Sequence, residues 1–190
     1  MTRFGGSYDL EEQPENTAYY VDVFLKLLTT GLGLLKFHLV GHHSGACLAT
    51  EIAADYPQHV LSIFLIGTAI MTREEQIALN ATANVPFNKP MPDGSHLMKT
   101  WAYLEGAGIG EDLELKQQEA LNHIRAWDGR NKIYTCIFKQ DMWGMFGRVA
   151  CPILTACAKD DVLWPYVHYI NEIVSQLSQT RFELTTDFVL

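Results

Sequence analysis

Apolar and polar positions along the chain follow two different periods. The uninterrupted apolar run at 60–66 is typical of a strand buried on both faces of a sheet, and shorter strands are predicted at 36–40, 151–157 and 181–185. Apolar residues recurring every three or four positions predict helices at 14–32, 45–56, 73–82, 111–127 and 166–177. Strands that alternate with helices in this way predict an α/β fold with a mostly parallel sheet and right-handed crossovers.

The sharpest local pattern joins the first strand to the helix that follows it. The apolar run at 36–40 breaks at Gly41, and the helical pattern restarts after Gly45. Small residues let the chain turn tightly, so the residue between them, His43, projects from the apex of the turn. The first N–H groups of the helix, those of Ser44 and Gly45, favour a developing negative charge.

Composition narrows the class of protein. The chain has 190 residues, 48% of them hydrophobic, which predicts one domain with one sizeable core. A net charge of −8 and a pI near 5.3 argue against nucleic acid or an anionic membrane as a partner. No apolar stretch reaches about 18 residues and no secretory signal is visible, so we expect a soluble, cytoplasmic protein.

Cofactor and metal motifs are not evident in the sequence. The glycines at 106–110 do not follow a strand, so they do not predict a phosphate-binding loop. The four cysteines lack C-x-x-C spacing, and reduced, buried thiols are expected at Cys47, Cys136, Cys151 and Cys157. We therefore predict no cofactor and no metal, with a small molecule as the substrate.

The glycine-flanked turn resembles the nucleophile elbow, G-x-S-x-G, of the α/β-hydrolase fold family. In register, His43 stands where the family has its nucleophile, and Ser44 follows one place late. Residues 158–165 resemble the loop that carries the family's catalytic acid, which assigns that role to Asp161. Residues 4–7 resemble the tail of the family's glycine-rich loop after its fourth strand.

The resemblance implies a partial α/β-hydrolase fold with a helical cap insertion. It assigns residues 1–72 and 149–190 to the core and 73–148 to the cap or lid. Aromatic residues of this region are core or pocket lining, and the pocket candidates are Trp101, Trp127, Trp143 and Phe146. The implied catalytic residues are Ser44, His43 and Asp161, with an oxyanion site at the backbone N–H groups of Ser44 and Gly45.

The chain departs from the family at both ends, which suggests a truncated or degenerate member. The strands expected before residue 4 are missing, so the strand at 36–40 is expected to have an unpaired edge that permits a homodimer. The family's catalytic histidine after the last strand is also missing, and Thr186, Asp187 and Phe188 take its place.

Three functions remain open from the sequence. The first is hydrolysis of an ester, lactone or thioester of a small, largely apolar metabolite; the resemblance suggests secondary metabolism, such as polyketide or toxin biosynthesis. The second is a lyase, isomerase or cyclase that uses His43 as its base. The third is a catalytically inactive relative, in which Ser44 only caps its helix.

Overall fold

The computed structural model describes residues 7, 10–176 and 182–185. Within them the chain forms two compact units, one from Met1–Pro14 and Ala78–Cys136, the other from Glu15–Ile77 and Ile137–Leu190. The predicted cap bounds, 73 and 148, stay a prediction. The terminal segments discussed above, 4–6 and 186–188, lie outside the described residues.

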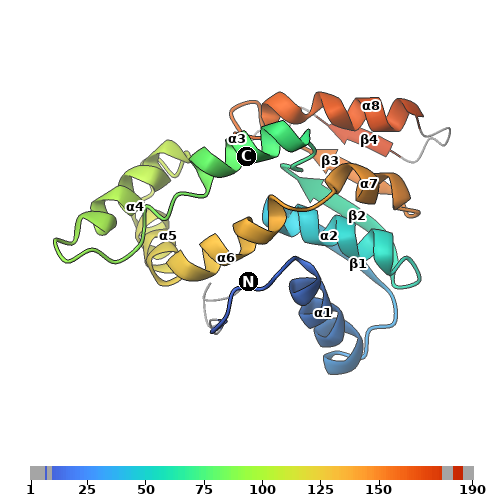
Figure 1. Cartoon of the computed structure of the whole chain (residues 1–190), viewed down its shortest axis with the longest axis horizontal. Coiled ribbons are helices and arrows are strands. Elements are labelled where there is room, and N and C mark those ends of the chain that lie inside the picture. Colours follow the sequence, from blue (N-terminus) through green and yellow to red (C-terminus); the bar gives the residue numbers. More distant parts are fainter. Residues whose placement is uncertain (1–6, 8–9, 177–181, 186–190) are drawn as a thin grey trace. The chain divides into compact units, whose positions relative to one another are not determined.

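The second unit contains a four-stranded parallel sheet in the order β1-β2-β3-β4 (Figure 1). The strands are β1 (Phe37–His42), β2 (Val60–Ile66), β3 (Ile153–Ala156) and β4 (Phe182–Thr185). Register aligns Val40 with Phe64 and Phe64 with Leu154 across the first three strands. The predicted α/β fold with a parallel sheet is confirmed, and each strand overlaps a predicted strand.

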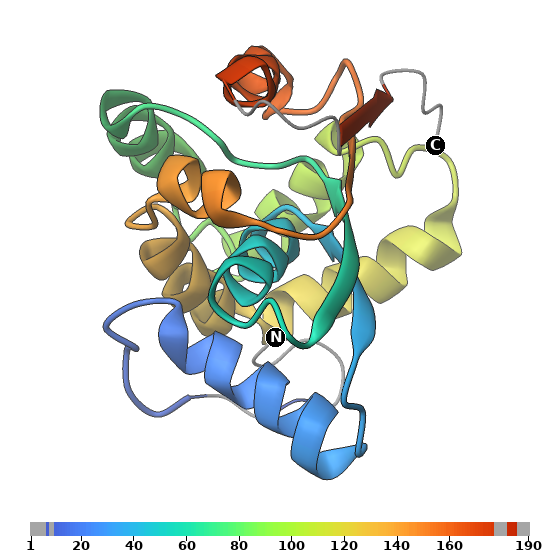
Figure 2. The same cartoon turned by 90° about the vertical axis from the view of Figure 1, so that its right-hand side faces the viewer.

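Helix α2 (Ser44–Asp55) is the central helix of this unit and packs on β1 and β2. Helix α1 (Ala18–Lys26), which a short π-helix at Leu27–Gly31 extends, and helix α7 (Met142–Arg148) both contact α2. Figure 2 shows α2 and α7 on the same side of the strands. Leu65 and Phe146 are fully buried, so the apolar faces of β2 and α7 supply the core of this unit.

Two further segments of the same unit follow β2 and β3. Helix α3 (Arg73–Ala83) begins in the sheet unit after β2. After β3, a 3₁₀ turn at Trp164–Tyr166 leads into α8 (His168–Gln176), which precedes β4.

The other unit is helical. It holds α4 (Ser95–Gly106), α5 (Leu113–Arg125) and α6 (Trp127–Ile137), of which α4 and α5 pack on each other. Lys116 is buried in this unit, with its ammonium 4.7 Å from the centre of the Trp101 ring and 3.4 Å from a Glu105 oxygen. In the described part of the chain, no helix combines the length and apolar character needed to cross a membrane.

Candidate active site

His43 occupies the apex of a sharp turn between β1 and α2. Its backbone angles, φ 48° and ψ −112°, make it the one non-glycine residue with positive φ among the described residues. Its N–H donates to the Ile66 carbonyl at 2.9 Å, which anchors the turn to β2. A Cβ on Gly41 would lie 2.3 Å from the Gly45 carbonyl oxygen, so only glycine fits where the strand passes the helix.

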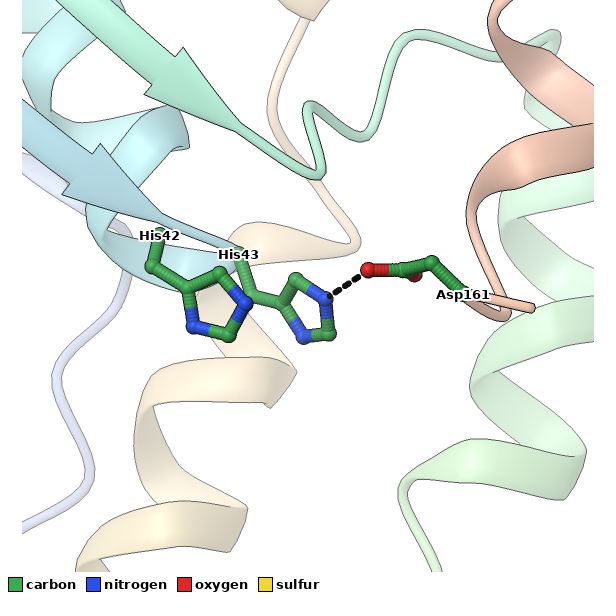
Figure 3. A group of neighbouring side chains, drawn as sticks. All are labelled: His42, His43 and Asp161. Carbon is green, nitrogen blue, oxygen red and sulfur yellow. Dashed lines mark hydrogen bonds and ion pairs between the residues drawn. The ribbon is translucent and has the colours of Figure 1, made fainter. Parts of the chain in front are cut away.

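Asp161 faces this apex from the loop after β3. Its Oδ2 lies 2.8 Å from Nε2 of His43 (Figure 3). Its Oδ1 accepts a hydrogen bond from the Leu163 N–H at 2.8 Å, which fixes the orientation of the carboxylate. The aspartate therefore holds His43 as a carboxylate holds a catalytic imidazole, through one ring nitrogen.

Gly67 completes the site from the end of β2. Its φ is +59°, and an added Cβ would lie 2.5 Å from Cδ2 and 2.8 Å from Nε2 of the His43 ring. Thus three neighbouring parallel strands each contribute one element at their carboxyl ends: the His43 turn, Gly67 and the Asp161 loop. This edge is where open α/β sheets place their ligands.

The hydrogen bond to Asp161 determines which nitrogen of the His43 ring carries the proton. Burial acts to raise the pKa of Asp161, but hydrogen bonds from His43 and from the Leu163 N–H outweigh it and hold that pKa below its usual value. An ionised carboxylate only accepts hydrogen bonds, so Nε2 of a neutral His43 carries the proton. Nδ1 then holds the free lone pair, and this nitrogen points away from Asp161 in Figure 3.

His42 lies directly beside the pair. Its ring stacks on that of His43, with ring centroids 4.1 Å apart and planes inclined by 24°. Partial burial, and then the neighbouring His43, lower the pKa of His42, while Asp161 acts in the opposite direction. One ligand-capable atom each from His42, His43 and Asp161 lies within 4.8 Å of the others.

Ser44 is the first residue of α2 and only 4% exposed. The structure therefore places the imidazole of His43, and not the Ser44 hydroxyl, at the apex of the turn. The N–H groups of Ser44 and Gly45 belong to the first turn of the helix, where no earlier helical carbonyl is within reach. The predicted oxyanion role of these two N–H groups stays a prediction.

The aromatic pocket candidates fall in different places. Trp101 and Trp127 belong to the helical unit, at α4 and at the start of α6. Phe146 is fully buried in the core of the sheet unit. Trp143 packs edge-on against Tyr169, and it lines a cavity of about 390 Å³ together with Arg73 and other residues of 71–76 and 139–142.

Two buried thiols near the site are unreactive as nucleophiles at neutral pH. Burial raises the pKa of Cys47 to about 12. Burial and the charge of Asp161 raise the pKa of Cys157 to about 11. Both remain protonated at neutral pH, and a protonated thiol is a poor nucleophile.

Two residues of the site, Gly67 and His42, were not predicted from the sequence. The one sequence signal for Gly67 is that a glycine directly follows a buried strand. Its close approach to His43 joins two different strands, so no local sequence pattern predicts it. No local pattern in the sequence singles out His42. Its stacking on His43 depends on the rotamers that both rings adopt.

Comparisons with known proteins agree with the fold. The sequence model of the alpha/beta hydrolase fold family matches residues 4–90. RutD of Pantoea ananatis, which bears the name of a carbamate hydrolase, is 22% identical over 143 residues. That match covers 73% of this chain and 52% of RutD, so the chain spans about half the length of this relative.

Solved structures show the same fold over nearly the whole chain. A hydrolase from Pseudomonas aeruginosa PA01 gives a TM-score of 0.72 at 17% identity, covering 97% of this chain and 68% of its own. The esterase EaEST from Exiguobacterium antarcticum gives 0.70 at 14% identity, covering 96% and 69%. These likenesses establish a shared fold, whereas the activities in the names belong to those proteins.

Proposed function

Because the chain is a member of the α/β-hydrolase fold, we propose that it is an enzyme that hydrolyses an ester, lactone or thioester. The observation that carries the proposal is the 2.8 Å contact between His43 and Asp161 at the apex of the elbow. An imidazole held by a carboxylate is a general base suited to neutral pH.

In this proposal water is the nucleophile, and no covalent intermediate forms. Nδ1 of His43 takes a proton from water while the water oxygen bonds to the carbonyl carbon. Asp161 stabilises the imidazolium that results, as the carboxylate of a catalytic triad does. The N–H groups of Ser44 and Gly45 stabilise the oxyanion, and the imidazolium returns its proton to the leaving alcohol or thiol as the carbon–oxygen or carbon–sulfur bond breaks.

The proposal also covers the size and polarity of the substrate. We expect a small, largely apolar molecule, since the predicted cap, residues 73–148, carries aromatic residues such as Trp101, Trp127 and Trp143. Lactones and thioesters of polyketide type are the first substrates to test, because the sequence resemblance points to secondary metabolism, including toxin biosynthesis.

The test compares two neighbouring aspartates of one loop. Asp161→Asn removes the charge that orients His43, and we expect kcat/KM on p-nitrophenyl and lactone esters to fall by roughly 10²–10⁴-fold. Asp160→Asn changes an exposed residue beside it and is expected to leave the rate within about twofold. Equal rates for the wild type and Asp161→Asn would overturn the assignment.

A fluorophosphonate separates this mechanism from a serine hydrolase. We expect no adduct on Ser44 of the folded chain, because its side chain is buried and His43 holds the apex. Intact mass and peptide mapping provide the measurement, with a melting curve to show that the chain is folded. An adduct on Ser44 would show that the serine, and not water, is the nucleophile.

The burial of Ser44 also supports a second candidate function. The same base can remove a proton from a carbon acid, as in a lyase, isomerase or cyclase, without any nucleophilic hydroxyl. Deuterium exchange into a β-keto ester, in the absence of hydrolysis, would favour this alternative.

A further inference from the structure

We infer that His42, His43 and Asp161 form a binding site for a divalent transition-metal ion, with Zn²⁺ as the ion of best fit. Two imidazoles and a carboxylate are ligands that Zn²⁺ prefers, and three protein ligands leave a fourth position for water. Within the described residues, this is the one group of three histidine, cysteine or acidic side chains gathered closely enough to share an ion.

The spacing of the donor atoms is close to what an ion requires. Ligands at about 2.0–2.2 Å from a tetrahedral Zn²⁺ lie roughly 3.3 Å from one another. The His43–Asp161 pair, at 2.8 Å, needs to open by about half an ångström, and the His42 donor lies within 4.8 Å of both. To reach the ion, the ring of His42 would turn out of its stack on His43, on the side where the residue is exposed to solvent.

Two of the three ligands are carried by well-anchored backbone. His42 is the last residue of β1, and His43 is tied to β2 through its N–H. Asp161 is fixed by the Leu163 N–H through the oxygen that does not face His43. The site thus forms from two neighbouring positions and one loop, as Figure 3 shows, and it needs no rearrangement of secondary structure.

An ion at this position would replace the hydrogen bond between His43 and Asp161. The metal and the catalytic proton therefore compete for the same two residues, and binding would oppose general-base catalysis by His43. The inference itself rests on the three donor groups and their spacing. It holds whether or not the chain hydrolyses an ester.

The experiment measures binding directly, on the full chain and without substrate. After dialysis against EDTA, Zn²⁺ is titrated by calorimetry and Co²⁺ by the visible absorption that a tetrahedral site gives. We expect one ion per chain. His42→Ala and Asp161→Asn should each weaken Zn²⁺ binding more than about tenfold. Loss of a residue that only hydrogen-bonds to a metal ligand already lowers metal affinity about 10- to 100-fold.

His38→Ala is the matched control, since His38 is an exposed histidine on the same strand and pairs with Ser62. Its affinity should equal that of the wild type, and circular dichroism checks that every variant is folded. The inference fails if the wild type binds no ion, if His42→Ala binds as tightly as the wild type, or if His38→Ala weakens binding equally. Because no turnover is measured, failure of the proposed hydrolysis would leave this result intact.

Discussion

The backbone at His43 has a conformation that side chains other than glycine rarely adopt. Such strain costs about 1–3 kcal/mol and persists only where the surroundings enforce it. Here the hydrogen bond from His43 to Ile66 and the packing of α2 on β1 and β2 enforce it. The strained turn therefore lowers the stability of the fold, and it holds the His43 imidazole at the carboxyl edge of the sheet.

Gly67→Ala is expected to separate His43 from Asp161. The new methyl would lie 2.5 Å from the His43 ring, and the positive φ of residue 67 disfavours alanine. We predict at least a roughly 10²-fold loss of kcat/KM and a free energy of unfolding lower by about 1 kcal/mol or more.

Gly45→Ala is the control for that prediction. A Cβ there meets nothing within 4 Å, and alanine suits the first turn of α2 better than glycine does. Its stability should match or exceed that of the wild type. If both variants lost activity equally, crowding against His43 would not be the cause.

Glu51 gives a prediction about pH. Burial raises the pKa of this α2 carboxyl, although hydrogen bonds from Thr17 and Gln140 act in the opposite direction. A folded-state pKa above the unfolded value of about 4.3 means that the folded chain binds the proton more tightly. The contribution of Glu51 to stability therefore falls as pH rises from about 4.3 through its folded-state pKa.

Glu51→Gln resembles the protonated carboxyl at every pH. Urea unfolding at several pH values should show the variant gaining on the wild type as pH rises through that window. A stability difference that stays constant with pH would contradict the assignment.

At the residue scale, sequence spacing was enough to identify the elbow and its apex. Gly41 and Gly45 bracket His43, and this local pattern survives folding unchanged. The meeting of His43 with Asp161 spans 118 positions, so it required the family resemblance as well. The contact with Gly67 follows only from parallel register, which no single segment encodes.

At the element scale, α7 depends on the residue that caps its N-terminus. Asp141 caps the helix by accepting from the Gly144 N–H at 2.9 Å, and α7 then packs on α2. Asp141→Ala should lower the free energy of unfolding by about 1 kcal/mol. Chemical denaturation followed by circular dichroism would measure the loss.

Asp112 offers the comparison, since it caps α5 in the other unit with the same 2.9 Å geometry. Asp112→Ala should remove a similar amount of stability from that unit and leave activity unchanged. An Asp141→Ala chain as stable as the wild type would mean that water replaces the cap at no cost.

Strands and long periodic helices could be predicted because their patterns are local. The apolar run at 60–66 coincides with β2, and the periodicity at 45–56 predicts α2 closely. Helix α4 was missed because prolines and glycines surround it. It begins after Gly94, whose φ of 71° supplies the turn into the helix.

At the scale of the whole molecule, β1 is the strand with an open edge. Within the described residues it pairs with β2 alone. The N–H groups of Phe37 and His43 both donate toward β2, so those of the even-numbered residues point to the other edge. Val40, in the middle of β1, is 72% exposed.

We therefore expect the chain to form a homodimer through β1. Light scattering coupled to size exclusion should show a dimer for the wild type, and Val40→Lys should shift it toward monomer, because a charged edge strand resists pairing. If the wild type is a monomer at all concentrations, the prediction of a dimer through β1 is wrong.

The sheet unit is built from two separate stretches of chain. Arg73 donates to the Phe138 carbonyl at 2.6 Å and Gln76 to the Gln140 carbonyl at 2.8 Å, so the stretches are joined where the chain leaves the unit and where it returns. The cost of closing such a loop rises by only about 0.6 kcal/mol for each doubling of its length. Insertions into loops between these anchors should therefore change the stability of the sheet unit little. They should slow its folding, because β2 cannot pair with β3 until the intervening helices have been synthesised.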